Sequence, residues 1–504
     1  MNQDPRLMRL DKFRLRVDNP QGIATTLFAS DEVPIETNAV TELLELLTLQ
    51  QSVEAFADAL PESFDETPCI EQVAVTPDFH KARGVPVGTV LATRGFIVPQ
   101  AIGSDINCGM RLHLTGLDAE MILSKREELD TTFRYLFFEG GRNIPMTGTQ
   151  RRALFTEGIT GLLSSVPKSQ TDGTWALFHD LPIADELGRI DHHGSPKAER
   201  VFALDDFIGQ PDTLSRDNQI GSIGGGNHFV EIQRVEKILD GTIAHAWGIK
   251  PGMVTVMVHT GSVGIGHLCG NYYRDVLRSL YPSSLKHPDN GIFPLPLARP
   301  EAALFWDAFH NAANFAFANR MFLALIALRG LHKVCGESGS SLLYDAPHNY
   351  LWREPSGQIL HRKGACPARG YEAMTNTEFA YTGEPVLVPG SMGTSSFLLA
   401  GRGNPESLSS ASHGAGRALS RGDALHGHEA EFQAFLERFR IVTPTDLRRQ
   451  DVKSRRDIVE KKLDEIRQEA PYAFKGIGPI IETLHGAQIA QPVAELTPLM
   501  TIKG

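Results

Sequence analysis

Three apolar, strand-like runs in the second half of this chain each stop at a histidine or at a glycine-serine loop. The runs and the residues that follow them are 254–258 with His259, 342–344 with His348, and 386–388 with Gly390 and Ser391. Polar residues that follow buried strands lie on loops that a rigid sheet holds in place, and binding and catalytic groups often occupy such loops. The pattern therefore predicts a core of β-sheet with a functional site at one set of strand ends.

Helices are predicted around those strands, which gives an α/β (α+β) fold with central mixed sheets. An amphipathic helix is predicted at 41–49, before the strand-like runs begin near residue 70. A long apolar helix is predicted at 311–331, and its few polar side chains, Asn314, Asn319 and Arg320, are interpreted as packing groups.

No change in composition marks a domain boundary. We therefore expect one large domain over residues 1–504. Within it, residues 1–60 are expected to serve as a packing segment, because they carry no catalytic constellation. Residues 446–504 are expected to be a helical segment with a short tail.

Composition limits the classes of protein to which the chain can belong. Of its residues, 41% are hydrophobic and 22% charged, which is ordinary for a soluble globular protein. The longest apolar run, 321–328, is far shorter than the roughly 20 residues that span a bilayer. Five scattered cysteines argue against a disulfide framework, and residues 1–6 are too polar for a signal peptide. We expect a cytoplasmic protein without a membrane partner.

The charge balance disfavours a protein that coats nucleic acid through bulk charge. The formal net charge is −11, although a local basic groove is compatible with it, and its candidates are Lys81, Arg83 and Arg94, Arg362 and Lys363, and the run 448–456. The most basic run, 448–456, has Asp451 within it and further acidic residues after it. It is therefore interpreted as a solvated helix face.

The stretch Ser409-Ser410-Ala411-Ser412-His413-Gly414-Ala415-Gly416-Arg417 sets an imidazole before three small residues and a basic run. Small residues let the backbone approach an anion, and a helix starting near Arg417 would point its first N–H groups at a phosphate. His413 would then contact the phosphorus. Taken alone, the stretch is more simply explained as a glycine turn with a capping histidine, so other motifs must decide.

Two further stretches carry groups suited to a metal or a phosphate. Asp105 and Cys108 lie three residues apart between glycines, a spacing that can place both on one ion. A buried cysteine beside a turn aspartate is the simpler interpretation. The stretch 221–232 leads from a glycine run into a strand with His228 and Glu231, but it matches neither the dinucleotide-binding nor the Walker pattern. The ordinary nucleotide-binding folds are therefore disfavoured.

Taken together, the motifs resemble the RtcB family of RNA ligases over roughly residues 70–504. In chain order they are Pro77-Asp78-Phe79-His80, Asp105-Ile106-Asn107-Cys108-Gly109-Met110, Gly224-Gly225-Gly226-Asn227-His228-Phe229, His259-Thr260-Gly261-Ser262, His348-Asn349, His361-Arg362-Lys363-Gly364, Pro389-Gly390-Ser391-Met392-Gly393, Ser412-His413-Gly414-Ala415-Gly416-Arg417 and Lys503-Gly504. Chance could supply one or two of these motifs, but not the ordered series.

The resemblance implies a centre of two Mn²⁺ ions. In it the thiolate of Cys108 bridges both ions, Asp105 and His228 complete one, and His259 and His348 complete the other. Two cations would lower the pKa of a bound thiol and disfavour the imidazolium form of a nearby histidine. Thiolate and imidazole ligands by themselves would suit Zn²⁺, so Mn²⁺ comes from the family and not from the ligands.

The resemblance also implies that GTP is the cofactor and that His413 is the nucleophile. His413 would attack the α-phosphate, release pyrophosphate and hold GMP through a phosphorus–nitrogen bond. The residues implied in guanylate binding are Asn227, His228, Phe229, Val230, Glu231, His348, Asn349, Pro389, Gly390, Ser391, Met392, Ser396, His413, Gly414, Ala415, Gly416 and Lys503, the last for the base.

The implied reaction joins RNA ends. GMP passes to an RNA 3′-phosphate, itself formed from a 2′,3′-cyclic phosphate, and a 5′-hydroxyl strand then displaces it to leave a 3′,5′ phosphodiester. The expected partner is therefore RNA with such ends. The resemblance also allows an archease-type activator protein.

Some residues depart from the family pattern. The segment His259-Thr260-Gly261-Ser262-Val263-Gly264 lacks the arginine that members usually carry at the position of Val263, and Asn107 stands where glycine is common. Neither change removes a metal ligand or the nucleophile. The departures concern the choice of substrate and suggest a divergent paralogue in RNA repair, not necessarily in tRNA splicing.

Three other functions stay open from the sequence. The first is a phosphoesterase whose two metals activate water without GTP. The second is an RNA-binding member that has lost ligation. The third is a protein in which the metal only stabilises the fold.

Overall fold

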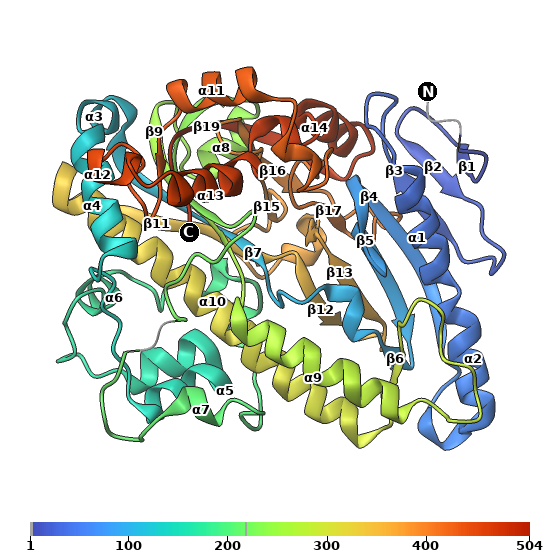
Figure 1. Ribbon diagram of the computed structural model, residues 1–504. Coiled ribbons are helices and arrows are strands. Elements are labelled where there is room, and N and C mark those ends of the chain that lie inside the picture. Colours follow the sequence, from blue (N-terminus) through green and yellow to red (C-terminus); the bar gives the residue numbers. More distant parts are fainter. Residues whose placement is uncertain (1–3, 217–218) are drawn as a thin grey trace.

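The computed structural model describes residues 4–216 and 219–504, so the first three residues of the polar N-terminus lie outside the described part. Within those ranges the strands form two large mixed sheets with helices around them, which confirms the predicted α/β (α+β) class (Figure 1). The seven-stranded sheet consists, in spatial order, of β1 (Leu7–Arg9), β2 (Arg14–Val17), β3 (Thr25–Phe28), β4 (Cys69–Arg83), β5 (Val85–Arg94), β13 (Ile359–Lys363) and β12 (Asn349–Arg353).

The second sheet has eight strands in the described residues. Its members, in spatial order, are β11 (Ser340–Pro347), β7 (Gly109–Asp118), β9 (Met253–Thr260), β8 (Phe229–Ile238), β19 (Ala490–Ile502), β16 (Ser396–Gly401) and β15 (Pro385–Val388), with β18 (Ile441–Val442) beside β19. Two short ladders pair β6 (Phe96–Ile97) with β10 (Leu295–Pro296) and β14 (Ala365–Pro367) with β17 (Ser410–Ser412). In the large sheets β3–β4 and β18–β19 are parallel, and the other pairs are antiparallel.

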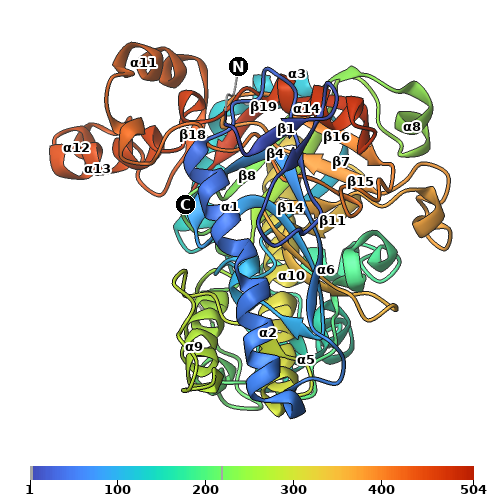
Figure 2. The same ribbon diagram turned by 90° about the vertical axis from the view of Figure 1, so that its right-hand side faces the viewer.

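Helices cover both sheets. They are α1 (Thr37–Leu47), α2 (Leu49–Ala59), α3 (Ala119–Ser124), α4 (Arg126–Phe138), α5 (Gly148–Ser165), α6 (Trp175–Asp180), α7 (Asp205–Ile208), α8 (Gly241–Ala246), α9 (Gly264–Leu280), α10 (Pro300–Cys335), α11 (Glu429–Arg438), α12 (Gln450–Lys453), α13 (Arg456–Arg467) and α14 (Ile477–Gly486). Figure 2 shows that α1 and α2 run in line along one side of the molecule, and that α11, α12 and α13 project from another.

The long helix α10 forms the centre of the larger hydrophobic core and contains the predicted helix 311–331. Its 36 residues are apolar on almost every side, the pattern of a helix buried all round. Pro300 stands in its first turn, and Gly336, with φ of 90°, follows its last. Its length and composition would allow it to cross a membrane, but its most apolar stretch is wholly buried inside the protein. Polar side chains on α10 must therefore find partners on neighbouring segments.

The register of the eight-stranded sheet brings the predicted strand-end residues to one edge. Gly109, which starts β7, lies opposite Thr260 of β9 and Pro347 of β11. Phe229, which starts β8, lies opposite His259 of β9. Because these neighbours are antiparallel, the starts of β7 and β8 share an edge with the ends of β9 and β11. The loops at that edge form one wall of the site.

The other wall comes from the seven-stranded sheet. His413 follows β17, whose partner β14 comes directly after β13 of that sheet. Residues of β4 and β5 lie beside it, so the site lies between the two sheets.

The structure corrects the prediction of a helix after His413. The segment 413–422 consists of bends and turns, and the N–H groups of Ala418 and Leu419 both donate to the carbonyl of Ala473. Gly416 has φ of 73°, and a Cβ there would lie 2.4 Å from the carbonyl oxygen of Asp78. This glycine therefore allows a close approach to β4, and the described segment 413–422 offers no helix N-terminus to a phosphate.

The predicted helical segment at 446–504 is only partly correct. It contains α12, α13 and α14 but ends in the 13-residue strand β19. Pro492 and Pro498 argue against a central strand, yet Pro498 lies at a register shift between β19 and β8, where a ladder bond can be missed. At the other end of the chain, residues 4–60 add β1, β2 and β3 to the seven-stranded sheet.

The basic run 448–456 is neutralised by nearby acids. Arg448 pairs with Glu127, Asp130 and Asp446. The next two arginines of the run form local pairs, Arg449 with Asp451 and Arg455 with Asp457. The run is thus the solvated face that the interleaved charges predicted.

Candidate active site

Five side chains converge at the shared edge of the eight-stranded sheet. Cys108 Sγ lies 3.3 Å from Nε2 of His228 and 3.3 Å from Nε2 of His259. On one side, His228 Nε2 lies 2.9 Å from a carboxylate oxygen of Asp105. On the other, His259 Nε2 lies 3.4 Å from His348 Nε2. The sulfur therefore lies between the Asp105–His228 pair and the His259–His348 pair, which is the arrangement that the family resemblance implied for a metal centre.

The donor atoms of this cluster fit a cation. Asp105 Oδ2 is buried and has no hydrogen bond within the described residues, although His228 Nε2 approaches it closely. His228 Nδ1 faces the carbonyl oxygen of Ile223 at 3.1 Å, and this contact leaves Nε2 with its lone pair toward the cluster. Burial holds the pKa values of His259 and His348 well below the usual value, so both rings are neutral. A metal ion can accept the lone pairs that this carboxylate oxygen and these imidazole nitrogens direct toward one another.

The thiol of Cys108 is coupled to metal binding through its proton. Burial and the neighbouring Asp105 carboxylate raise the pKa of Cys108 well above its ordinary value. A thiolate at this position therefore requires a cation, and metal binding releases a proton.

The loop after β9 wraps closely around Asp105. A Cβ on Gly261 would lie 2.5 Å from Asp105 Oδ2, so only glycine fits there. The N–H of Val263 donates to Oδ1 at 3.0 Å, and Val263 adopts φ of 49°, a strained conformation for a β-branched residue. The backbone of Val263, and not its side chain, thus contacts the Asp105 carboxylate.

Two polar residues at the middle of α10 support the loops that carry the cluster. Arg320 is fully buried and donates from Nε to Asp345 at 2.9 Å. It also donates to the carbonyl of Asn107, next to Cys108, and to that of Thr260, next to His259, the latter at 3.1 Å.

Asn319 supports the remaining loops. Its side-chain oxygen accepts from the N–H of Gly221 at 2.7 Å, and its amide donates to the carbonyls of Ser222 at 2.9 Å and Gly261 at 3.3 Å. The two neighbouring residues thus contact segments next to Cys108, His228 and His259. The sequence had marked both only as packing groups.

His413 lies between the cluster and a buried carboxylate. Its ring centroid is 4.7 Å from that of His348, and its Nδ1 lies 2.6 Å from Asp78 Oδ2. Burial would raise the pKa of Asp78, but the hydrogen bond and charge of His413 outweigh it and lower the pKa overall. An ionised carboxylate only accepts, so Nδ1 carries a proton, and in the neutral ring the lone pair lies on Nε2.

Asp78 is a functional residue to which the sequence assigned no role. It is fully buried in β4, where it also accepts a hydrogen bond from the hydroxyl of Thr76. The signal was present in the motif Pro77-Asp78-Phe79-His80, but nothing local shows that Asp78 faces a histidine 335 residues away.

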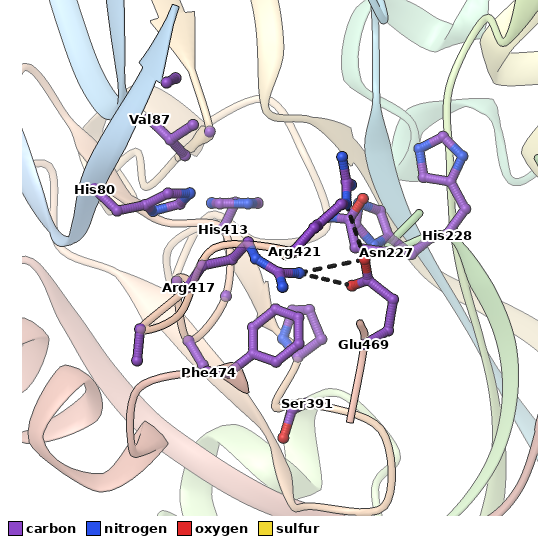
Figure 3. A pocket seen from close by; sticks show the side chains of 18 of the residues that line it. His80, Val87, Asn227, His228, Ser391, His413, Arg417, Arg421, Glu469 and Phe474 are labelled. Carbon is purple, nitrogen blue, oxygen red and sulfur yellow. Dashed lines mark hydrogen bonds and ion pairs between the residues drawn. The ribbon is translucent and has the colours of Figure 1, made fainter. Parts of the chain in front are cut away.

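A cavity of about 760 Å³ opens over His413 (Figure 3). The predicted residues that line it are Asp105, Cys108, Asn227, His228, Phe229, Glu231, His259, His348, Asn349, Pro389, Gly390, Ser391, Met392, His413, Gly414, Ala415, Gly416 and Lys503. Two predicted residues do not reach the wall. The side chain of Val230 packs into the core, and the Ser396 hydroxyl accepts from the N–H of Gly390 at 3.3 Å from behind the loop.

One half of the cavity contains a buried carboxylate, Glu231, and a buried ammonium, Lys503. Burial raises the pKa of Glu231 to about 7, and the side chains of Thr501 and Gln233 donate to its carboxylate. Burial lowers the pKa of Lys503 to about 8, and its ammonium donates to the carbonyls of Gly226 and His228. The C-terminal residues thus reach the loop before β8.

The cavity mouth carries an ion-pair group that the sequence did not predict. Arg417 and Arg421 follow His413, and both pair with Glu469, at 3.2 Å and 3.4 Å (Figure 3). Glu469 comes from the segment after α13, so this pairing connects the loop after His413 to the C-terminal helices.

A histidine oriented by a buried carboxylate, beside a cluster of metal-binding type, defines an enzyme site suited to covalent phosphoryl or nucleotidyl transfer. Residues 62–504 match the family model described as tRNA-splicing ligase RtcB. The chain therefore belongs to the RtcB family, which confirms the resemblance that its motifs carry.

Individual relatives align over most of their length. The tRNA-splicing ligase RtcB of Thermococcus kodakarensis is 30% identical over 525 residues, covering 99% of each chain. The RNA-splicing ligase RtcB of Mycobacterium tuberculosis is 34% identical over 450 residues, covering 85% of this chain and 96% of the relative. The tRNA-splicing ligase RtcB of Pyrobaculum aerophilum is 31% identical over 503 residues, covering 94% of this chain and 95% of the relative.

Substitution of Cys108 tests the cluster. We expect Cys108→Ala to lose bound metal and to abolish nucleotide transfer to the protein, because the shared sulfur is removed from between two ligand pairs. Metal content after dialysis, measured by atomic emission, checks this, with Cys269→Ala on α9 as the control. Full metal content in Cys108→Ala would refute the bridging position.

Proposed function

We propose that this protein is a GTP- and Mn²⁺-dependent RNA ligase that joins 2′,3′-cyclic phosphate or 3′-phosphate ends to 5′-hydroxyl ends. The observation that carries the proposal is the placement of His413, whose Nδ1 is held by Asp78 at 2.6 Å while its ring lies 4.7 Å from that of His348. A phosphorus atom bound beside the cluster would lie within reach of Nε2. Membership of the family adds the RNA chemistry.

The half of the cavity that contains Glu231 and Lys503 suits guanine. A guanine base offers N–H donors on one edge and the acceptors O6 and N7 on another. Glu231 supplies an acceptor and Lys503 a donor at the same wall. Asn227, Phe229, Asn349 and the loop 389–392 complete this half of the cavity and are proposed to hold the ribose and the base.

In the proposed first step, Nε2 of His413 attacks the α-phosphorus of GTP. A nitrogen–phosphorus bond forms, the bond to the bridging oxygen breaks, and pyrophosphate leaves. Asp78 holds the proton on Nδ1 throughout and stabilises the positive charge that develops on the ring. Two Mn²⁺ ions, held by Asp105, Cys108, His228, His259 and His348, would stabilise the charge that develops on phosphate oxygens.

For a 2′,3′-cyclic end, water first attacks the phosphorus and breaks its bond to O2′, which leaves a 3′-phosphate and a 2′-hydroxyl. Two further displacements then complete the reaction. An oxygen of the RNA 3′-phosphate attacks the guanylate phosphorus, and His413 leaves with its electron pair. The 5′-hydroxyl of the second strand then attacks the RNA phosphorus, loses its proton and expels GMP. A cytoplasmic location and an archease-type activator remain proposals that rest on the sequence alone.

Transfer of label from GTP tests this proposal. Wild type incubated with α-labelled GTP and Mn²⁺ is expected to yield an acid-labile, alkali-stable protein label, whereas His413→Ala yields none. His485→Ala, on an exposed face of α14, is the control. Absence of label in the wild type with any divalent metal would favour a GTP-independent phosphoesterase or a non-ligating RNA-binding protein.

A further inference from the structure

The cavity continues past His413, away from the half proposed for guanylate. This second half is walled by Glu36 and Asn38 at the start of α1, by His80 and Lys81 near the end of β4, and by Lys363 at the end of β13. In Figure 3, His80 and Val87 lie on one side of His413, and Asn227 and His228 lie on the other. His413 therefore faces two compartments of one cavity.

Hydrogen bonds to backbone groups hold the side chains of Glu36 and His80 in this wall. Glu36 accepts from the backbone N–H of Lys81 at 3.4 Å, which joins α1 to β4. His80 faces the carbonyl oxygen of Asp78 through Nδ1 at 2.8 Å. Within residues 4–216 and 219–504, the ammonium of Lys81, the amide of Asn38 and Nε2 of His80 have no hydrogen-bond partner. Asn38 and Lys81 are exposed and His80 is half-buried, so these three polar groups on one wall of the cavity are available to a ligand that enters it.

Part of this wall comes from outside the family model. The match begins at residue 62, whereas Glu36 and Asn38 belong to the segment that the sequence marked only for packing. The N-terminal segment thus both extends a sheet and contributes side chains to the cavity that holds His413.

We propose that this compartment binds the terminal nucleotide of an RNA strand, with Lys81 on a phosphate and with Asn38 and His80 on the ribose or base edge. The inference rests on the proposed function, because guanylate on His413 occupies the other compartment when RNA must arrive. Lysine and asparagine side chains are among the usual contacts of proteins to phosphate and sugar oxygens.

The same compartment could instead receive the pyrophosphate that leaves GTP. The two ligands require different steps of the reaction, so separate assays distinguish them. Guanylate formation depends on the pyrophosphate position but not on RNA. Strand joining from preformed guanylate depends on RNA but not on pyrophosphate.

The test uses Lys81→Ala and Asn38→Ala, singly and together, in the full chain. Lys237→Ala and Asn271→Ala, exposed residues that do not line the cavity, are the matched controls. With Lys81→Ala we expect label transfer from GTP to stay within about twofold of wild type, and single-turnover joining from the labelled protein to fall about tenfold. The double variant is expected to fall further.

Direct binding supplies a readout that does not depend on GTP. Fluorescence anisotropy with 3′-phosphate and 5′-hydroxyl oligoribonucleotides, without GTP, is expected to show Kd about tenfold higher for Lys81→Ala. The slope of log K against log salt should also fall by about one, as for one lost phosphate contact. Thermal melting checks that each variant is folded.

The outcomes separate the two proposals. Slower label transfer with unchanged joining in Lys81→Ala would assign the compartment to pyrophosphate and overturn the inference. Unchanged label transfer, joining and RNA binding would also overturn it. Failure of the wild type to take label would refute the proposed function, whereas a selective loss of RNA binding in Lys81→Ala would still support the RNA compartment.

Discussion

Asp78→Asn is expected to slow transfer of GMP to His413 by roughly 10²- to 10⁴-fold. Asparagine is nearly isosteric, but its amide group can donate to Nδ1 of His413 at the position where the carboxylate now accepts. The ring proton would then move to Nε2, which loses the lone pair needed for attack. The rate of label transfer from α-labelled GTP, measured in single turnover, checks the prediction.

The control for this prediction separates orientation from metal binding. Asp78 is not part of the cluster, so Asp78→Asn should keep the metal content of the wild type, unlike Cys108→Ala. Asp275→Asn, on the exposed face of α9, is the matched control, and it should change neither the rate of label transfer nor the metal content. A wild-type rate of transfer in Asp78→Asn would show that the buried carboxylate does not set the tautomer of His413.

The site residues that were predictable from the sequence share one feature: each lies in a short ordered motif at a strand end. His259 ends an apolar run and His348 follows another, and the antiparallel register brings both to the edge where β7 begins. Such residues are recognisable because the motif itself determines their local position. The family resemblance then supplied the roles that spacing alone left open.

The residues that were missed act across long sequence separations. Asp78 meets His413 only because β4 passes under the turn at Gly416. Asn38 was missed, and it shares a wall with Lys81, a residue that the sequence offered for a basic groove, because α1 packs on β4. The helix predicted after Arg417 failed for the same reason, since its N–H groups bond to Ala473, far along the chain. Local propensity carries no information about such partners.

Arg320 is the clearest case of a residue whose role depends on tertiary contacts, and Arg320→Met is expected to lower the free energy of unfolding by about 3–5 kcal/mol. The substitution removes the buried positive charge beside Asp345 and the guanidinium hydrogen bonds to the carbonyls of Asn107 and Thr260. Asp345 still forms an ion pair with Arg111 at 3.0 Å, so its buried negative charge keeps one of its two partners. The midpoint of urea unfolding measures the loss.

The same variant should weaken metal binding, because the released carbonyls flank Cys108 and His259. We expect the affinity for Mn²⁺, measured by competition with a chelating dye, to fall about 10- to 100-fold. Asn314→Ala is the matched control: Asn314 is also fully buried on α10, but its amide bonds to Phe155 and Pro196, away from the cluster. It should lower stability while leaving the metal affinity unchanged. If both variants lose stability and both keep their metal affinity, Arg320 supports only the fold, and the geometry of the cluster must be set by the strand register alone.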